Sequence, residues 1–170
     1  MHRLSQLSLF GWGRILALTL AAVTCLSVSY SQAQGLGYAI AGPTGYAGFW
    51  GSGIGIHAAG GGEFLIKNQV GIGAEIGALG SGSSLLSVFS ANGGFHFSRD
   101  ASQRLVPFAS GGYTRMGNAD GSFNTWNIAG GIDYWFKRRV AFRMEVRDHV
   151  RPDSRGTVQY WSFRVGVAFR

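Results

Sequence analysis

The chain has 170 residues, a formal net charge of +7 and a mean hydropathy of +0.11. This hydropathy is too low for a bundle of membrane helices, each of which needs about 20 predominantly apolar residues. The basic charge is compatible with nucleic-acid binding, but no recognition motif or basic helix accompanies it, so nucleic acid is not an expected partner.

Residues 1–33 are typical of a cleavable secretory signal peptide. Arg3 and Arg14 supply a basic start, residues 15–23 supply an apolar segment, and Ser31 and Ala33 are the small residues that a signal peptidase reads. We predict cleavage before Gln34, which leaves residues 34–170 as one domain. A retained anchor is disfavoured because the apolar segment is too short to span a membrane. The only cysteine, Cys25, is lost with the signal, which excludes disulfides.

The first two predicted strands follow the signal peptide. Residues 36–42 alternate only weakly between apolar and polar positions, and we expect this strand to end near Pro43. Residues 54–67 alternate clearly, with His57 and Glu63 on the polar face, and a tight turn follows at 67–69. The apolar face of this second strand carries Ile54, Ile56, Ala58, Gly60, Gly62, Phe64 and Ile66.

The third and fourth predicted strands show the same period of two. In the third strand, residues 70–78, Glu75 lies among glycines on the polar face, and the strand ends at the Gly/Ser run 80–83. The fourth strand, residues 85–97, has Ser90 and His96 on its polar face, and a turn is expected over 98–103. The apolar faces carry Val70, Ile72, Ala74, Ile76 and Ala78, then Leu85, Phe89, Ala91, Phe95 and Phe97.

The fifth and sixth predicted strands are joined by a strong hairpin signal at residues 117–121. The fifth strand, residues 104–116, contains Pro107 and does not show which face is apolar, so its register stays open. The sixth strand, residues 126–136, places Asp133 on its polar face, and the basic residues 137–139 turn the chain. Its apolar face carries Trp126, Ile128, Ile132, Tyr134 and Phe136.

The last two predicted strands alternate most regularly. In the seventh strand, residues 140–147, the apolar positions alternate with Arg143, Glu145 and Arg147. Residues 148–156 are expected to form the longest late loop. The eighth strand ends the chain, with apolar side chains at every second position: Trp161, Phe163, Val165, Val167 and Phe169.

The chain combines an export signal with strands that carry glycine, arginine and glutamate on one face. This combination indicates a polarity opposite to that of a soluble protein, with apolar side chains outside and polar side chains inside. A strand needs only about 9 to 11 residues to cross a membrane, so eight strands use roughly 88 of the residues after the signal and leave roughly seven for each connection. We therefore predict an all-β fold, an eight-stranded antiparallel up-and-down transmembrane β-barrel with its apolar face toward lipid. An even strand count places both ends of the barrel domain on one side of the membrane.

From residue 35 to the end, the pattern resembles a small bacterial outer-membrane β-barrel of the OmpA/OmpX type. The most specific element is the terminal strand, whose row of Trp161, Phe163, Val165, Val167 and Phe169 resembles the C-terminal signal of the barrel-assembly machinery, although Arg170 follows the last aromatic residue. The resemblance implies a location in the cell outer membrane, insertion by that machinery and a monomeric barrel with a structural or surface-interaction role.

The polar face of the strands carries charges of both signs, which we expect inside the barrel. An isolated charge in a narrow lumen is costly, so opposite charges on neighbouring strands should pair. An eight-stranded barrel is just wide enough to be filled by its side chains, which predicts a salt-bridged plug and not a pore. A narrow gated channel for ions or small solutes is the first alternative. The predicted lumen charges are Glu63, Lys67, Glu75, Asp133, Arg143, Glu145, Arg147 and Arg164.

Two further alternatives come from other functional classes. A soluble periplasmic, lipocalin-like ligand binder would enclose Trp161 and Phe163 and leave the charges in water. An outer-membrane lipid-modifying enzyme would need a nucleophile beside a base, as His149, Asp148 and Ser154 could supply in the last outer loop. His57 and His96 inside the barrel are a second candidate set for that chemistry. No spacing motif joins either set, so neither catalysis nor a metal or cofactor is expected.

Arginines near the predicted outer loops are candidate contacts for lipopolysaccharide. A guanidinium group suits phosphate because it offers paired donors in a planar arrangement. The candidates are Arg115, Arg147, Arg151 and Arg155.

Overall fold

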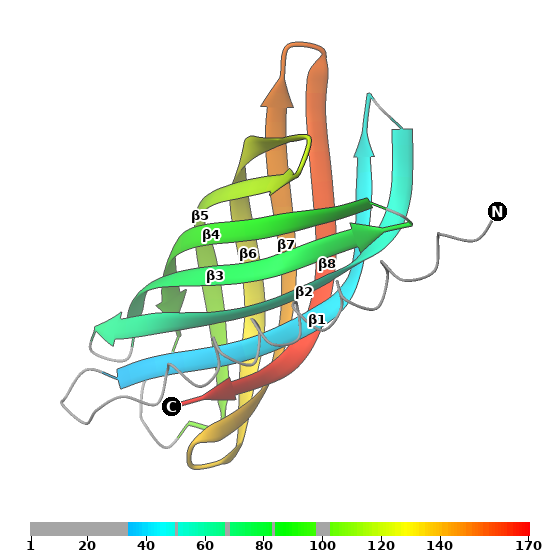
Figure 1. Cartoon of the computed structure of the whole chain (residues 1–170). Coiled ribbons are helices and arrows are strands. Elements are labelled where there is room, and N and C mark those ends of the chain that lie inside the picture. Colours follow the sequence, from blue (N-terminus) through cyan, green and yellow to red (C-terminus); the bar gives the residue numbers. More distant parts are fainter. Residues whose placement is uncertain (1–33, 50, 67–68, 83, 98–102) are drawn as a thin grey trace.

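In a computed structural model, the chain forms a closed barrel of eight antiparallel strands (Figure 1). The structure describes residues 34–49, 51–66, 69–82, 84–97 and 103–170, so the predicted signal peptide lies outside the described residues. The strands are β1 Gln34–Gly48, β2 Gly51–Ile66, β3 Val70–Ser81, β4 Ser84–His96, β5 Leu105–Asn118, β6 Gly121–Lys137, β7 Val140–Asp153 and β8 Gly156–Phe169. Each strand pairs with the next, and β8 closes the barrel by pairing with β1. The described residues contain no helix long and apolar enough to cross a membrane.

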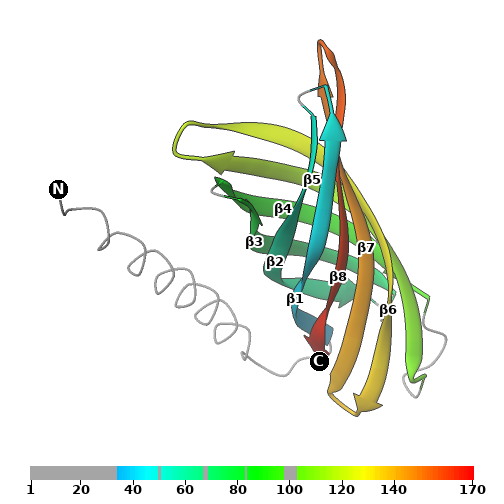
Figure 2. The same ribbon diagram turned by 90° about the vertical axis from the view of Figure 1, so that its right-hand side faces the viewer.

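The strands are longer, and most connections shorter, than the sequence led us to expect. Strand lengths run from 12 residues in β3 to 17 in β6. The predicted loop 148–156 is wrong, because β7 continues to Asp153 and β8 begins at Gly156, with only residues 154–155 between them. Gly156 has a positive φ of 134°, a conformation that costs glycine little and permits this tight turn. Because these strands are long, the hairpins of β1–β2 and β7–β8 project beyond the barrel (Figures 1 and 2).

The structure corrects the predicted end of one proline-containing strand and assigns the face of the other. The first strand does not end near Pro43, since β1 continues to Gly48 and Pro43 still pairs with Ile56 of β2. A proline removes one N–H donor but leaves its carbonyl and the extended backbone intact. In β5, Val106 and Phe108 are buried whereas Leu105 is exposed, so the face that the sequence left open is assigned.

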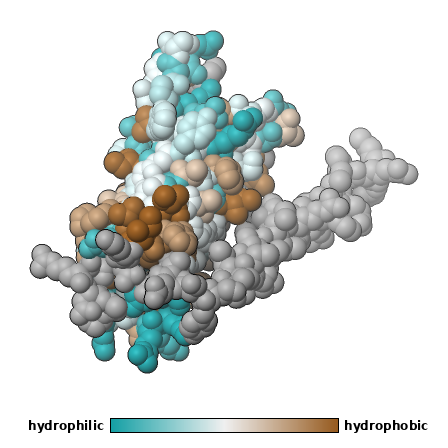
Figure 3. Space-filling view, turned by 90° about the vertical axis from the view of Figure 1, so that its left-hand side faces the viewer, coloured by the Kyte–Doolittle hydropathy of each residue, from teal (hydrophilic) through white to brown (hydrophobic). Residues whose placement is uncertain are grey.

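The barrel is apolar outside and polar inside over most of its height. Large hydrophobic side chains at outward positions of β2 to β8 are exposed, among them Ile56, Ile72, Phe89 and Ile128. Figure 3 shows hydrophobic residues gathering across one side of the barrel, with hydrophilic surface at the hairpins above and the turns below. This arrangement is the reverse of a soluble protein and is that of a barrel in lipid.

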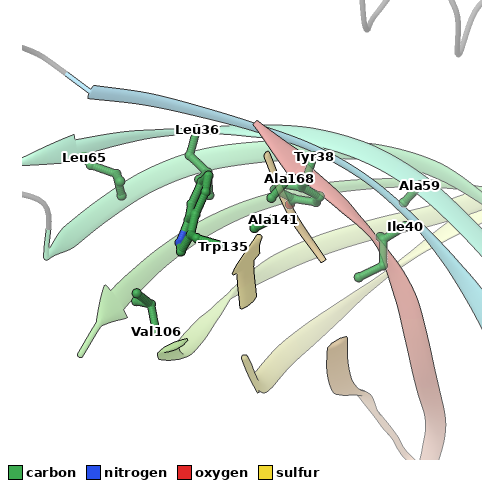
Figure 4. Close-up of a cluster of buried hydrophobic side chains, with 9 residues drawn as sticks. All are labelled: Leu36, Tyr38, Ile40, Ala59, Leu65, Val106, Trp135, Ala141 and Ala168. Carbon is green, nitrogen blue, oxygen red and sulfur yellow. The ribbon is translucent and has the colours of Figure 1, made fainter. Parts of the chain in front are cut away.

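A cluster of inward-facing hydrophobic residues fills the lumen at the end where β1 begins and β8 ends (Figure 4). Trp135 of β6 lies in this cluster, with Leu36 and Val106 on either side of its ring. The guanidinium of Arg170 lies 4.1 Å from the ring centre of Trp135. The members of the cluster are Leu36, Tyr38, Ile40, Ala59, Leu65, Val106, Trp135, Ala141 and Ala168.

Candidate functional site: the ion-paired lumen

The strands bring seven of the eight predicted lumen charges inside the barrel. Because side chains alternate across a strand, every second residue of β2, β3, β6, β7 and β8 faces the same enclosed space. Six of the seven are at most 2% exposed, and the side chain of Glu63 is 12% exposed. The eighth residue, Lys67, lies outside the described residues. The seven are Glu63, Glu75, Asp133, Arg143, Glu145, Arg147 and Arg164.

The first of two ion-paired groups centres on Arg143. Asp133 of β6 lies directly across from Arg143 in the strand register, and its two carboxylate oxygens accept hydrogen bonds of 2.7 and 2.8 Å from the guanidinium. The remaining terminal nitrogen donates to Glu63 over 3.2 Å. Glu63 also contacts the His96 ring nitrogen at 2.8 Å. Such paired donors fix the side chain in direction as well as in charge.

Aromatic rings enclose the guanidinium of Arg143. Its central carbon lies 4.6 Å from the ring centre of Tyr38 and 4.4 Å from that of Phe108, close enough for cation–π attraction. Two inward-facing glycines make room for these rings. A Cβ at Gly61 would lie 2.5 Å from the Tyr38 ring, and one at Gly131 would lie 2.6 Å from the Phe108 ring. Part of the barrel's glycine content is therefore explained by aromatic packing in the lumen.

The second group centres on Arg164 of β8. Its two terminal nitrogens donate to Glu75 over 2.9 and 3.0 Å, and one of them also contacts Glu145. Arg147 donates to Glu145 over 2.8 Å. The hydroxyl of Tyr38 donates to Glu75 over 3.1 Å, and this links the second group to the first. Strands far apart in sequence are thereby joined through the lumen.

Charges in the described lumen come close to balancing. The four carboxylates of Glu63, Glu75, Asp133 and Glu145 face three guanidinium groups. His96 lies between Glu63 and Asp133 and adds a fourth positive charge when it is protonated. Near balance is what a narrow, low-dielectric interior requires, because an uncompensated buried charge is costly.

A layer of neutral polar side chains lies beyond the second ion-paired group. Arg147 donates to Asn127 over 2.9 Å, and Asn127 donates to Thr114 over 2.9 Å. His57 and His149 lie side by side with ring centres 5.8 Å apart, and neither ring nitrogen of His149 has a hydrogen-bond partner. A second hydrophobic cluster of Leu79, Val88 and Met116, with Leu86, Phe123 and Tyr160 against it, follows this layer. Side chains thus fill the lumen from one end to the other.

The four candidate arginines for lipopolysaccharide differ in their exposure. The assignment of Arg147 is wrong, because this side chain is 2% exposed and paired with Glu145 inside the barrel. The error followed from the predicted loop at 148–156, which is mostly strand. Arg115 and Arg155 are exposed, and Arg115 donates to the Ser122 hydroxyl over 2.7 Å. Arg151 is half-buried, pairs with Asp153 at 3.3 Å and stacks on Phe123.

The residues considered for lipid chemistry do not form a catalytic arrangement. His149 faces the lumen and is fully buried, while Asp148 is the next residue on the strand and Ser154 lies exposed in the β7–β8 turn. His57 and His96 belong to different layers of the lumen. Among the described residues, no group of three or more histidine, cysteine or acidic side chains is placed to hold a metal ion.

Several lumen residues were not assigned from the sequence. Phe108 was missed because the face of its strand was open, and Tyr38 because the first strand alternates weakly. Asn127 and Ser162 lie at polar positions that alternation had already placed on the inner face, but no partner was predicted for either of them. Their role in linking charged groups depends on which strands meet across the lumen.

The terminal strand presents its apolar row outward. The exposed fractions of these side chains are 51% for Trp161, 51% for Phe163, 39% for Val165, 37% for Val167 and 41% for Phe169. A lipocalin-like barrel would enclose them and expose Glu145 and Arg164, which are instead 2% and 0% exposed. The soluble alternative is therefore contradicted by the polarity of the barrel.

Comparison with known proteins shows similarity only at the level of structure. No protein-family model and no curated protein matches the chain. Neisserial surface protein A (NspA) is 12% identical, with a TM-score of 0.61 over 82% of this chain and 99% of that chain. The N-terminal β-barrel domain of Pseudomonas aeruginosa OprF is 18% identical, with a TM-score of 0.58 over 81% of this chain and 98% of that domain.

A third solved structure limits what the similarity means. A de novo designed transmembrane β-barrel is 16% identical, with a TM-score of 0.56 over 83% of this chain and 97% of the design. The barrel fold is therefore compatible with proteins that have no shared activity. The predicted eight-stranded barrel and its resemblance to small outer-membrane barrels are confirmed as a fold, and the lipid-facing exterior agrees with the predicted outer-membrane location.

Proposed function

We propose that this protein is a monomeric, integral outer-membrane barrel with a closed lumen, whose role is structural or lies in interactions at the cell surface. The observation that carries the proposal is the pair of buried ionic groups around Arg143 and Arg164, each held by two carboxylates. Hydrophobic clusters lie on either side of the polar lumen. A solute would have to displace these contacts to pass, which argues against transport as the principal role.

Planar-bilayer recording tests this proposal. We expect inserted wild-type protein to give no conductance steps, because the ion pairs would have to break for each opening. Insertion is checked separately by the shift in gel mobility between unheated and heated samples. Sustained conductance steps that disappear in Glu63→Gln or Arg143→Met variants would contradict the proposal and support the gated channel.

The exposed arginines at the projecting hairpins support a second part of the proposal, contact with lipopolysaccharide. Arg115 on β5 and Arg155 in the β7–β8 turn lie at the end away from the terminal residues of the barrel. Replacing both by glutamine should reduce the lipopolysaccharide that copurifies with the protein. Arg138→Gln, in the exposed turn at the opposite end, is the matched control. Equal retention in all three proteins would remove this part of the proposal.

The outward apolar row of β8 supports insertion by the barrel-assembly machinery. Phe169→Ala should slow the appearance of the heat-modifiable folded form in cells. Phe142→Ala is a matched control, because Phe142 is 40% exposed on the neighbouring strand and Phe169 is 41% exposed. Equal rates for the two variants would argue that Phe169 acts only as one more lipid-facing side chain.

We also propose that the protein is not an enzyme. This proposal is supported by the divergent positions of His149 and Ser154, which share no accessible space. Mass spectrometry of lipid A from cells with and without the protein should show identical species. A modified species that depends on the protein would establish an enzyme.

A further inference from the structure

Asp148 is an acidic residue on the outside of the barrel. In β7, Arg143, Glu145 and Arg147 point inward, so the even-numbered positions point outward. The strand register agrees, because Asp148 lies directly opposite Trp161 of β8 and Ile128 of β6. These two residues are 51% and 67% exposed on the outer surface, and directly opposed residues share a face.

The carboxylate of Asp148 is only partly satisfied by the protein. One oxygen accepts a hydrogen bond of 3.3 Å from the side-chain amide of Gln159. The other oxygen is buried and has no hydrogen-bond partner, and the residue as a whole is 8% exposed. A carboxylate held among apolar side chains at a membrane surface is costly, and such a residue usually has a partner. The described residues supply the Gln159 amide and the backbone of Tyr160, but no cation pairs with Asp148 among them.

The depth of Asp148 indicates where its partner would come from. On β8 the outward positions are apolar from Phe169 to Trp161 and become polar at Gln159 and Thr157. On β6 the same change falls between Trp126 and Asn124. Indole rings at such a change of polarity mark the boundary between hydrocarbon and headgroups. Asp148 lies beside this boundary, within reach of the headgroup layer.

We propose that Asp148, Gln159 and Trp161 form a binding site for the ammonium group of an aminolipid. The carboxylate supplies the opposite charge and an acceptor for the ammonium N–H groups. The indole face of Trp161 adds cation–π attraction from beside it. The amide of Gln159 orients the carboxylate through its hydrogen bond. This inference rests on the proposed insertion of the barrel in a membrane. Because Asp148 lies toward the β7–β8 hairpin, where lipopolysaccharide is the proposed neighbour, the ligand is an amine-bearing headgroup on that side of the membrane, and phosphatidylethanolamine serves as the probe for it.

Native mass spectrometry of the folded barrel with competing lipids tests the site. The protein is offered equal amounts of phosphatidylethanolamine, which carries an ammonium group, and phosphatidylglycerol, which carries none. We expect wild type to retain the aminolipid preferentially and Asp148→Asn to lower that preference about tenfold, the effect of losing one hydrogen bond to a charged group. Asp153→Asn, which removes an acid from the same strand nearer the turn, should leave the preference unchanged.

The outcomes separate this inference from the proposed function. Gel mobility first establishes which variants are folded, and Gln159→Leu provides a second test of the site if Asp148→Asn does not fold. A folded wild-type protein with no preference for phosphatidylethanolamine, or a preference that survives both substitutions, overturns the inference while the barrel proposal stands. A second copy of the chain bound through Asp148 in place of lipid would also overturn it. A wild-type chain that never inserts in membranes would instead refute the proposed function.

Discussion

The buried ion pair of Glu75 and Arg164 makes a quantitative prediction about the stability of the barrel. Arg164 donates two hydrogen bonds to Glu75, and the two side chains are at most 1% exposed. Arg164→Met removes the charge but keeps much of the side-chain volume. Glu75 then retains only the Tyr38 hydroxyl at 3.1 Å and Arg147 at 3.9 Å. We expect a loss of about 3–5 kcal/mol in the free energy of unfolding, the usual cost of an uncompensated buried charge.

The double variant Glu75→Leu/Arg164→Met separates this cost from the value of the pair. Both charges are removed together, and Glu145 keeps its hydrogen bonds from Arg147 at 2.8 and 3.3 Å. Replacement of a whole buried pair by apolar groups is often neutral or stabilising, so most of the loss should be recovered. The coupling energy between the two sites should be at least about 2 kcal/mol.

Urea unfolding in lipid vesicles, followed by tryptophan fluorescence, measures these differences. Arg115→Met is the matched control, because Arg115 is exposed and its replacement should change stability by less than about 0.5 kcal/mol. A loss below about 1 kcal/mol for Arg164→Met, or single losses that simply add in the double variant, would refute the view that these charges depend on one another in a dry lumen.

Three other predictions concern the lumen and the exterior. His149→Leu should leave stability unchanged or raise it, because both ring nitrogens are buried without a partner; a urea-measured loss above about 1 kcal/mol would contradict this. Gly131→Val should cost about 1–3 kcal/mol through contact with the Met144 carbonyl oxygen and the Phe108 ring, whereas Gly130→Val, whose Cβ would have no atom closer than 3.9 Å, should be tolerated. Phe163→Arg should cost about 2–4 kcal/mol in vesicles, and an undiminished folding yield would argue against lipid contact.

The prediction of inside and outside from the sequence succeeded where alternation was regular. In β2, Ile54 and Ile56 are 80% and 65% exposed while His57 is fully buried, as their parity predicted. Prediction from alternation failed where the assignment depended on knowing at which residue a strand ends. Arg147 continues the inward series of Arg143 and Glu145, yet its nearness to a predicted loop also suggested an outer position, and the structure supports only the first assignment.

Strand ends were predicted poorly because they are not set by the lipid boundary. The apolar run of β8 ends at Trp161, but pairing continues to Gly156 since the hairpin satisfies its own backbone hydrogen bonds in water. The same reason extends β1 beyond Pro43. Polarity therefore locates the membrane on a strand and leaves its length open.

The sequence by itself determined the number of strands and the face of most residues, because a period of two is a local property that any regular strand expresses. Only the tertiary structure decided which charges meet. Glu75 and Arg164 are 89 residues apart, and Glu63 and Arg143 are 80 apart. Their pairing depends on the closure of β1 on β8 and on the stagger of all eight strands, so no single stretch of the chain contains that information.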